Sequence, residues 1–411
     1  MVTSDVVEVT KMVPGALLND KGGLPTWLEQ AAQEAWQKAE KVLKSQSVSE
    51  DIAKYREDPI GFCKDLLGMG FTDDVVRMLN SVVVNPVTIA RSANSVGKTY
   101  SAAALAVWFY SVFPDAQVYL TAAPPIENLK KLLWGKIATI ARKKPTLFGG
   151  HQLMELAILR HKESFIMGVT IPTTGTKEER EAKFSGKHAP HLLFIVDEGD
   201  GVPDEVYKGI ESCMSGGMAR LLILFNPRVK AGPVWEKEEK GQANVVEMSA
   251  FSHPNVITGE DVIPGAVSRE ITVRRIHQWT RPLAGGEVID DNCFEVPEFL
   301  IGHVATALDG KQYPPLQGGW RKVTDPAFFY MVLGIYPSQA VKQLISESWI
   351  TAARKRWDEY VAAHGEIPPK DERPIMGLDL AEYGTDYNVA CLRYKETGFV
   401  PKVKILSLIH I

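Results

Sequence analysis

The segment from Arg91 to Thr99 constrains the fold of this 411-residue chain more than any other. It follows two β-rich runs, Val82–Val84 and Val87–Ala90, and it leads directly into an apolar segment with helical character, Tyr100–Tyr110. A loop that ends in Gly-Lys-Thr between a strand and a helix is typical of a phosphate-binding loop. The backbone N–H groups of such a loop and the N-terminus of the next helix direct positive partial charge toward the phosphates. We therefore expect an α/β fold that binds a nucleotide.

The positions of this loop have expected roles in binding ATP. The residues expected to line the phosphates are Ser92, Ala93, Asn94, Ser95, Val96, Gly97, Lys98 and Thr99. We expect Lys98 to reach the β- and γ-phosphates and the Thr99 hydroxyl to bind Mg²⁺. Ser92 occupies the position of the usual first glycine, so the interpretation needs support from a second motif.

A pair of carboxylates supplies that second motif. The apolar run Leu192–Val196 is followed by Asp197 and Glu198. In a nucleotide hydrolase the first acid holds Mg²⁺, directly or through water, and the second polarises the attacking water as general base. Solvated acids at the end of a core strand are the alternative, but this alternative weakens because Gly97-Lys98-Thr99 lies upstream. We therefore predict ATP hydrolysis.

Short β-rich runs alternate with helical stretches from Val87 to Pro227, and this pattern predicts an α/β domain with a mostly parallel sheet. The expected strands are Val87–Ser92, Gln117–Ala122, Ser164–Thr170, Leu192–Val196 and Leu221–Phe225. The last two are continuous apolar runs, as expected for strands that are buried on both faces.

The run Leu221–Phe225 also ends in polar residues, Asn226-Pro227-Arg228. In P-loop motors, the strand beside the Walker B strand often ends in a polar residue that senses the γ-phosphate and couples hydrolysis to movement. Asn226 is the candidate for this role, and Arg228 is a second one. A turn-forming Asn-Pro at a strand end explains the same residues equally well.

An arginine that completes the site has two candidates. The charged segment before Asp197 contains Lys177, Arg180, Lys183, Lys187 and His188, interleaved with glutamates. As a mobile basic loop it could contact DNA phosphates, or supply Arg180 as an arginine finger to a neighbouring subunit. A solvated loop without a further role is the simpler interpretation. Arg91 competes with Arg180 as a cis-acting arginine.

Bulk properties limit the partners that this chain can have. The net charge is −4, so DNA binding requires a local basic surface. No apolar run approaches the roughly 20 residues that span a bilayer, and the N-terminus lacks the basic region of a signal peptide. The cysteines lie far apart, which argues against a zinc site or a disulfide framework; they are Cys63, Cys213, Cys293 and Cys391. We expect a soluble, intracellular protein that is not in a membrane.

Composition and loop signals suggest a division of the chain. We expect an N-terminal arm and a helix from Thr26 in residues 1–55, and a P-loop ATPase core in residues 56–255. An associated subdomain and a linker are expected in residues 256–370, followed by a new β-rich domain in residues 371–411.

A further carboxylate, Asp379, lies in the apolar run that begins at Pro374, with Gly384 and Asp386 after it. A metal nuclease uses such an aspartate to hold Mg²⁺ or Mn²⁺. One carboxylate does not make a two-metal site, and an aspartate on a strand is more often structural.

Together these segments resemble the large terminase subunit of tailed bacteriophages, the motor that packages DNA into the capsid. The resemblance runs from about Asp58 to Asp386. It depends on these segments: Val96-Gly97-Lys98-Thr99, Phe184–His188, Ile195–Glu198, Phe225–Pro227, His253–Val256, Phe328–Gly334, Tyr336-Pro337 and Gly377–Ala381. An adenine-contacting glutamine common in the family is absent near Phe71–Val75.

The resemblance implies an ATPase of the additional-strand, catalytic-glutamate type, followed by an RNase H-like nuclease that begins at about residue 371. It implies duplex DNA, a small terminase subunit and the portal protein as partners, a homo-oligomeric ring as the working form, and the host cytoplasm as the location. We expect the nuclease to be incomplete in this chain. The last six residues, Leu406–Ile411, can be encoded by a transposon mosaic end used in sequencing adaptors, so we expect that the reading frame ran into adaptor sequence there.

Two other interpretations of the residues remain open. The first is another nucleic-acid-dependent P-loop ATPase, such as a helicase-like translocase, which usually has a second motor-like domain with further arginine motifs. The second is a non-catalytic nucleotide-binding assembly protein, in which Glu198 is idle.

Overall fold

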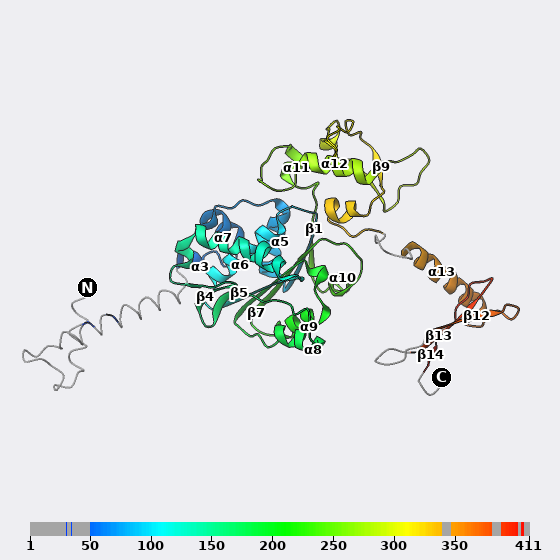
Figure 1. Cartoon of the computed structure of the whole chain (residues 1–411), viewed down its shortest axis with the longest axis horizontal. Helices are drawn as coiled ribbons and strands as arrows, with labels where there is room; N and C mark the ends of the chain where they lie inside the picture. Colours follow the sequence, from blue (N-terminus) through cyan, green and yellow to red (C-terminus); the bar gives the residue numbers. More distant parts are fainter. Residues whose placement is uncertain are drawn as a thin grey trace, which may run out of the picture. The chain divides into compact units, whose positions relative to one another are not determined.

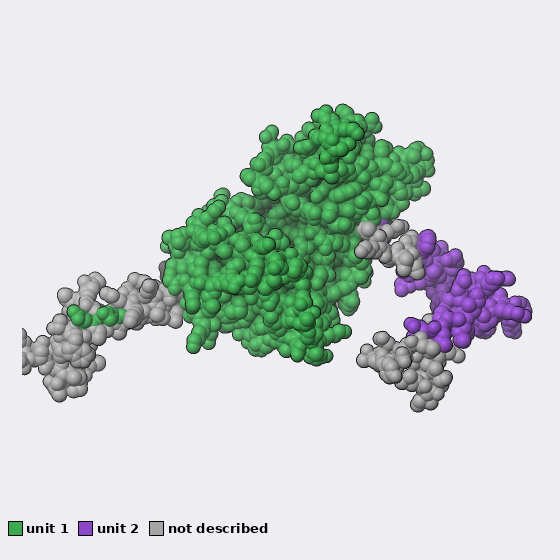
Figure 2. Space-filling model, in the orientation of Figure 1, with its two compact units in different colours: residues 1–337 green, residues 338–411 purple. Residues whose placement is uncertain are grey.

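The computed structural model describes residues 30, 34, 50–338, 347–379, 388–401 and 404–406. The chain divides into two compact units, Met1–Pro337 and Ser338–Ile411, coloured separately in Figure 2. The rest of the helix expected from Thr26, the residues Gly384 and Asp386, and the segment Ser407–Ile411 lie outside the described residues. Among the described helices, none has the length and apolar character needed to cross a membrane. The finer domain boundaries stay predictions.

The first unit contains helices on both sides of a large sheet and a smaller β-region after it (Figure 1). Its α-helices are α3 (Glu50–Ala53), α4 (Pro59–Phe62), α5 (Asp73–Val84), α6 (Lys98–Val112), α7 (Gly135–Lys143), α8 (Lys177–Phe184), α9 (Asp204–Ser212), α10 (Pro233–Glu239), α11 (Pro254–Thr258) and α12 (Arg269–Trp279). Its 3-10 and π-helical turns are η2 (Cys63–Leu67), η3 (Asn128–Trp134), η4 (Pro145–Phe148), η5 (Gly199–Gly201), η6 (Glu298–Leu300) and η7 (Phe329–Leu333). Its strands are β1 (Val87–Ser92), β2 (Ala116–Ala122), β3 (Gln152–Leu153), β4 (Ala157–His161), β5 (Ser164–Gly168), β6 (His191–Asp197), β7 (Met218–Phe225), β8 (Asn244–Met248), β9 (Thr280–Pro282), β10 (Cys293–Glu295) and β11 (Trp320–Val323).

The large sheet has eight strands in the order β3-β4-β5-β2-β6-β7-β1-β8. All neighbouring pairs from β5 to β8 are parallel, whereas β4 runs antiparallel to both β3 and β5. The prediction of a mixed α/β fold with a mostly parallel sheet is therefore confirmed. The order places β7 between β1 and β6, so the strand before the phosphate-binding loop and the strand before Asp197 are separated by one strand.

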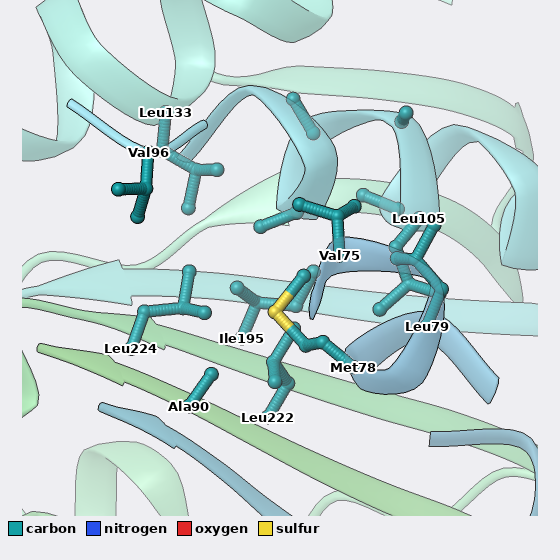
Figure 3. Packing of buried hydrophobic residues seen from close by; sticks show 14 of the residues in the cluster. Val75, Met78, Leu79, Ala90, Val96, Leu105, Leu133, Ile195, Leu222 and Leu224 are labelled. Carbon is teal, nitrogen blue, oxygen red and sulfur yellow. The ribbon is translucent and has the colours of Figure 1, made fainter. Parts of the chain in front are cut away.

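Successive side chains of a strand point to opposite faces of the sheet, so the buried apolar residues form two layers. Leu222 and Leu224 of β7 pack on one face with Leu79 of α5 and Leu105 of α6 (Figure 3). The intervening Ile223 packs on the other face with residues of α8, α9 and α10. Both faces of the strands are covered by helices, which explains why β6 and β7 are apolar at nearly every position.

Helix α6 lies in the centre of the first layer, and twelve consecutive residues from Ser101 to Val112 are buried. A helix that is apolar all round belongs in a core rather than at a surface. Trp108 is fully buried, and its indole N–H donates to the carbonyl oxygen of Tyr55 at 2.7 Å. The helix that follows the phosphate-binding loop is therefore fixed in the core from Ser101 to its end.

Two local expectations were wrong. Val82–Val84 belongs to helix α5, because the Thr72 side chain accepts from the Val75 N–H at the helix start, and Asn85-Pro86 stops the helix after Val84. The segment at Lys177 is helix α8 rather than a loop, since Thr176 and Glu179 form a capping box at its N-terminus.

The second unit contains helix α13 (Glu347–His364) and a three-stranded antiparallel sheet. The strands are β12 (Pro374–Asp379), β13 (Asn388–Tyr394) and β14 (Lys404–Leu406), in sequence order. This sheet contains Asp379 as the last residue of β12.

Candidate active site

The candidate site lies at the carboxyl edge of the large sheet. In the parallel pairing, Arg91 of β1 is opposite Phe225 of β7, and Ala122 of β2 is opposite Asp197 of β6. The loops that follow these strands therefore leave the sheet at the same edge. This geometry brings the residues after β1, β6 and β7 together, although they are far apart in the sequence.

Lys98 and Asn226 are joined directly at this edge. Lys98 Nζ donates to Asn226 Oδ1 at 2.6 Å, and Asn226 Nδ2 donates to the carbonyl oxygen of Ser92 at 2.6 Å. The Asn226 side chain is 5% exposed, so both of its polar atoms are satisfied inside the protein. Asn226 thus bridges the first residue of the loop and the lysine at its end.

Thr99 and Asp197 form the second contact across the site. The Thr99 hydroxyl donates to Asp197 Oδ2 at 3.1 Å. Asp197 is 1% exposed, and burial raises the pKa of its carboxyl to about 6, while the nearby Lys98 acts in the opposite direction. A hydroxyl and a carboxylate are hard oxygen donors of the kind that Mg²⁺ prefers, so these two residues fit a magnesium–nucleotide site.

Glu198 lies in a left-handed backbone conformation with φ of 50°. Such a conformation is costly for a residue with a side chain, and it persists only where the surroundings enforce it. Gly199 helps to enforce it: a Cβ at this position would lie 2.5 Å from Ile223 Cγ2 and 2.8 Å from the Tyr207 hydroxyl. The Tyr207 hydroxyl donates to the carbonyl oxygen of Gly199 at 2.8 Å, and this bond fixes the turn that presents Glu198.

Cations flank the Glu198 carboxylate. Lys98 Nζ lies 3.7 Å from Glu198 Oε1, and Arg228 Nη2 lies 3.8 Å from Glu198 Oε2. Arg228 also pairs with Asp200 at 3.5 Å, and burial raises the pKa of that carboxyl. The sequence interpretation missed Asp200, although its position two residues after Glu198 was a usable signal.

The phosphate-binding loop is held by backbone contacts from later parts of the first unit. The N–H of Ala93 donates to Met248 O at 2.8 Å, and the N–H of Asn94 donates to Met331 O at 3.2 Å. Ser95 O accepts from the N–H of Val267 at 2.9 Å. The loop is thus tied to the end of β8, to η7 and to the segment before α12. No signal in the sequence pattern indicated these three contacts.

The unusual first position of the loop has a structural reason. Ser92 is the last residue of β1, is buried, and does not have a positive φ. The positive φ values in the loop occur instead at Ser95, with 60°, and at Gly97, with 94°. Since glycine is needed mainly where φ is positive, Gly97 requires it and position 92 does not.

The two arginine candidates contact other carboxylates. Arg91 pairs with Glu238 at 3.1 Å and Glu247 at 2.8 Å, and its guanidinium lies 5.5 Å from the centre of the Tyr336 ring. Arg180 pairs with Glu205 at 2.6 Å. The arginine that lies beside Glu198 is Arg228, which the sequence suggested only as a second candidate for the sensor.

Asp379 is not part of a comparable constellation. It is exposed at the end of β12. Within the described part of the chain, no group of three or more histidines, cysteines, aspartates or glutamates is arranged to hold a metal ion.

Comparison with known proteins gives one curated match and several structural ones, and no family model matches the chain. The chain is 26% identical over 193 residues to a protein of Enterobacteria phage P7 named "Probable terminase, large subunit", which covers 46% of this chain and 39% of that protein. The match therefore spans well under half of the relative's length.

The solved structures include the large terminase ATPase domain of Thermus phage P74-26, with 16% identity, a TM-score of 0.39, and coverage of 52% of this chain and 91% of that chain. They also include the large terminase of a thermophilic bacteriophage in complex with ADP, with 12% identity, a TM-score of 0.41, and coverage of 82% of this chain and 69% of that chain. The sequence match confirms the resemblance that the motifs predicted, and the chain is similar to the large terminase subunits of phages.

Proposed function

We propose that this chain is an ATPase of a viral DNA-packaging motor, which hydrolyses ATP to move double-stranded DNA into a procapsid. The observation that carries the proposal is the pair of contacts at the sheet edge, Thr99 with Asp197 and Lys98 with Asn226. These contacts assemble a lysine, a hydroxyl, a carboxylate and an amide at the carboxyl ends of three separate strands, β1, β6 and β7. The similarity to a phage terminase large subunit directs this chemistry toward DNA packaging.

The sheet order supports the additional-strand, catalytic-glutamate subtype of P-loop ATPase. In that subtype one strand separates the P-loop strand from the Walker B strand, and β7 occupies this place between β1 and β6. The subtype also requires a glutamate directly after the Walker B aspartate, which is Glu198 here.

Each residue of the site then has a proposed role. Ser92–Thr99 form the loop around the phosphates. The N–H groups of Ala93 and Asn94 already donate to Met248 O and Met331 O, so the proposed phosphate donors are the N–H groups of Ser95–Thr99. Lys98 neutralises charge on the β- and γ-phosphates. Thr99 and Asp197 hold Mg²⁺, which supplies charge neutralisation on the phosphate oxygens. Glu198 accepts a proton from the attacking water as general base.

Asn226 is proposed as the sensor of the γ-phosphate. Its oxygen contacts Lys98 and its amide contacts Ser92, so displacement of Lys98 toward a phosphate changes the contacts of β7 as well. Arg91 and Arg180 remain candidates for a stabilising arginine, and we add Arg228, which the sequence suggested only as a second sensor. Arg91 and Arg180 would have to leave their carboxylate partners to act in this way, whereas Arg228 already lies beside Glu198.

The remaining parts of the proposal follow from the family resemblance. The antiparallel strands β12, β13 and β14 are proposed as the beginning of an RNase H-like nuclease, in which Asp379 contributes one ligand to Mg²⁺ or Mn²⁺. The proposed partners are double-stranded DNA, a small terminase subunit and the portal protein. The proposed working form is a homo-oligomeric ring in the host cytoplasm.

Two substitutions test the ATPase. Lys98→Ala is expected to abolish ATP turnover and weaken nucleotide binding, because the phosphates lose their main cation. Glu198→Gln is expected to abolish ATP turnover and to leave nucleotide binding largely intact, because glutamine keeps the shape of the glutamate side chain but does not accept a proton from water. Lys240→Ala, an exposed lysine on the same unit, serves as the matched control. Phosphate release and binding of a fluorescent ATP analogue are the measurements.

The outcome also separates the rival interpretations. Unchanged hydrolysis by Glu198→Gln would contradict its role as base. ATP binding without hydrolysis in the unmodified chain would favour a nucleotide-binding assembly protein. Unwinding of a DNA duplex driven by ATP would favour a helicase-like translocase.

A further inference from the structure

A segment of the first unit has a concentrated positive charge. Residues 128–154, which include η3 and α7, contain no aspartate and no glutamate. The basic residues of this segment are Lys130, Lys131, Lys136, Arg142, Lys143 and Lys144. The whole chain has a net charge of −4, so this segment differs in sign from the average of the molecule.

Packing directs these cations outward. The apolar residues of the segment are buried against the core, namely Leu129, Leu133, Trp134, Ile137, Ile140 and Ala141. The side chains of Lys131, Lys136, Arg142 and Lys143 are exposed, and that of Lys144 is half-buried. Lys136 and Lys143 are seven positions apart in α7, so they lie on one side of the helix, about 10 Å apart along its axis.

Most of these cations have no carboxylate partner. Lys130 pairs with Glu155 at 2.6 Å. The structure shows no ion pair between any of the other five and a carboxylate of the described ranges. Some exposed lysines elsewhere in the unit do pair with carboxylates, as Lys208 does with Asp204 and Lys240 with Glu236. The positive charge on this face is therefore available to an external anion.

The segment is also connected directly to the candidate active site. Ala122, the last residue of β2, is opposite Asp197, and the N–H of Ala123 donates to Asp197 O at 3.2 Å. The Asn128 amide then donates to Ala123 O at 3.0 Å, at the start of η3. Only residues 123–127 separate the end of β2 from the basic segment. Two hydrogen bonds therefore link the backbone of Asp197 to the start of this segment.

We propose that the outer face of η3 and α7, from Lys131 to Lys144, binds duplex DNA through its phosphates. The proposal rests on the proposed function, which makes duplex DNA the substrate of the motor. A protein partner would need an apolar centre in the contact surface. The large apolar side chain exposed on this face is Leu132, and one leucine does not form such a centre. The regular array of duplex phosphates matches separate exposed cations such as Lys136 and Lys143, and the affinity of such contacts falls steeply as the salt concentration rises.

The test compares two triple variants with the same change of net charge. Lys136→Gln/Lys143→Gln/Lys144→Gln removes unpaired cations of the proposed face. Lys208→Gln/Lys240→Gln/Lys311→Gln removes three exposed lysines that pair with carboxylates outside the face. Fluorescence anisotropy of a labelled duplex of arbitrary sequence, over a series of KCl concentrations, gives affinity and salt dependence for each full-length protein. ATP turnover without DNA and thermal unfolding are measured in parallel.

The face variant is expected to bind the duplex roughly ten- to a hundred-fold more weakly. It is also expected to reduce the steepness of log affinity against log salt concentration by about 2–3, because each lost phosphate contact reduces this slope by about 0.9. The control variant is expected to keep the slope of the unmodified chain, and both are expected to keep its DNA-free ATP turnover. Equal affinity and slope for the two variants would overturn the proposal. Absence of ATP turnover in the unmodified chain would instead refute the proposed function, so the two failures are distinguishable.

Discussion

Two aspartates end strands in the described part of the chain, and their surroundings are opposite. Asp197 ends β6 in the middle of an eight-stranded sheet, is 1% exposed, and accepts from the Thr99 hydroxyl. Asp379 ends β12 in a three-stranded sheet and is exposed. The two look alike in sequence, since each follows an apolar run. The comparison shows that an acid at a strand end becomes a site only when neighbouring strands supply partners at the same edge.

The largest expected difference between the two aspartates is in ATP turnover. Asp197→Ala is expected to lower kcat by about a thousand-fold or more, which corresponds to about 4 kcal/mol of lost transition-state stabilisation. Asp379→Ala is expected to leave kcat unchanged, because it lies in a separate unit and the turnover site is built from residues of the first unit. Steady-state phosphate release measures both. A large loss in Asp379→Ala would break the contrast.

Two glycines provide the next test, on stability. Gly199→Ala is expected to lower the free energy of unfolding by about 3 kcal/mol, since its Cβ would meet Ile223 and Tyr207 inside a packed core. Gly377→Ala in β12 is expected to change it little, because its Cβ would meet Cys391 O at an ordinary 3.9 Å. Urea unfolding followed by tryptophan fluorescence measures both variants. Similar effects would show that the turn after β6 is no more tightly packed than β12.

The smallest expected effect concerns pH. Burial raises the pKa of Asp197 to about 6 from an ordinary 3.8, so the native state binds the proton more tightly than the unfolded state. The stability contributed by this group is therefore present at low pH and is lost as pH rises through about 6. Asp197→Asn removes this loss, and we expect it to stabilise the nucleotide-free protein by about 1–2 kcal/mol at neutral pH.

The control for this prediction is the same substitution at the exposed aspartate. The gain from Asp197→Asn is expected to shrink as the pH is lowered from neutral toward the ordinary pKa of 3.8. Asp379→Asn, which replaces an exposed side chain, is expected to change the stability little at neutral pH. Thermal unfolding at a series of pH values gives both curves. A gain for Asp197→Asn that does not vary with pH would show that ionisation of this carboxyl has no part in it.

The sequence predicted the large sheet well where one physical rule dominated. Continuous apolar runs marked β6 and β7, because strands covered on both faces leave no polar positions. The rule failed for Val82–Val84, where three β-branched residues suggested a strand. There the cap at Thr72 and the stop at Asn85-Pro86 determine a helix instead.

The sequence predicted the contacts between the two motifs of the candidate site. It missed the contacts that residues without a motif make to the site from distant parts of the chain. The proximity of Thr99 to Asp197 follows from parallel strands that end at one edge, so the two motifs were sufficient to predict it. The surroundings of Arg91 depend on Glu238 and Glu247, which lie far along the chain and carry no motif. The contact from Met331 to the loop is made by its backbone carbonyl. Since every residue type has a backbone carbonyl, the identity of the residue does not indicate such a contact.

The backbone contacts of the phosphate-binding loop have a consequence for synthesis of the protein. The N–H groups of Ala93 and Asn94 find their partners at Met248 and Met331, which leave the ribosome much later than the loop itself. During translation these two groups must be solvated by water, even when the strand before them has emerged. The loop therefore acquires its final hydrogen bonds only after η7 has been made, and a polypeptide stalled before this segment would not yet have a complete nucleotide pocket.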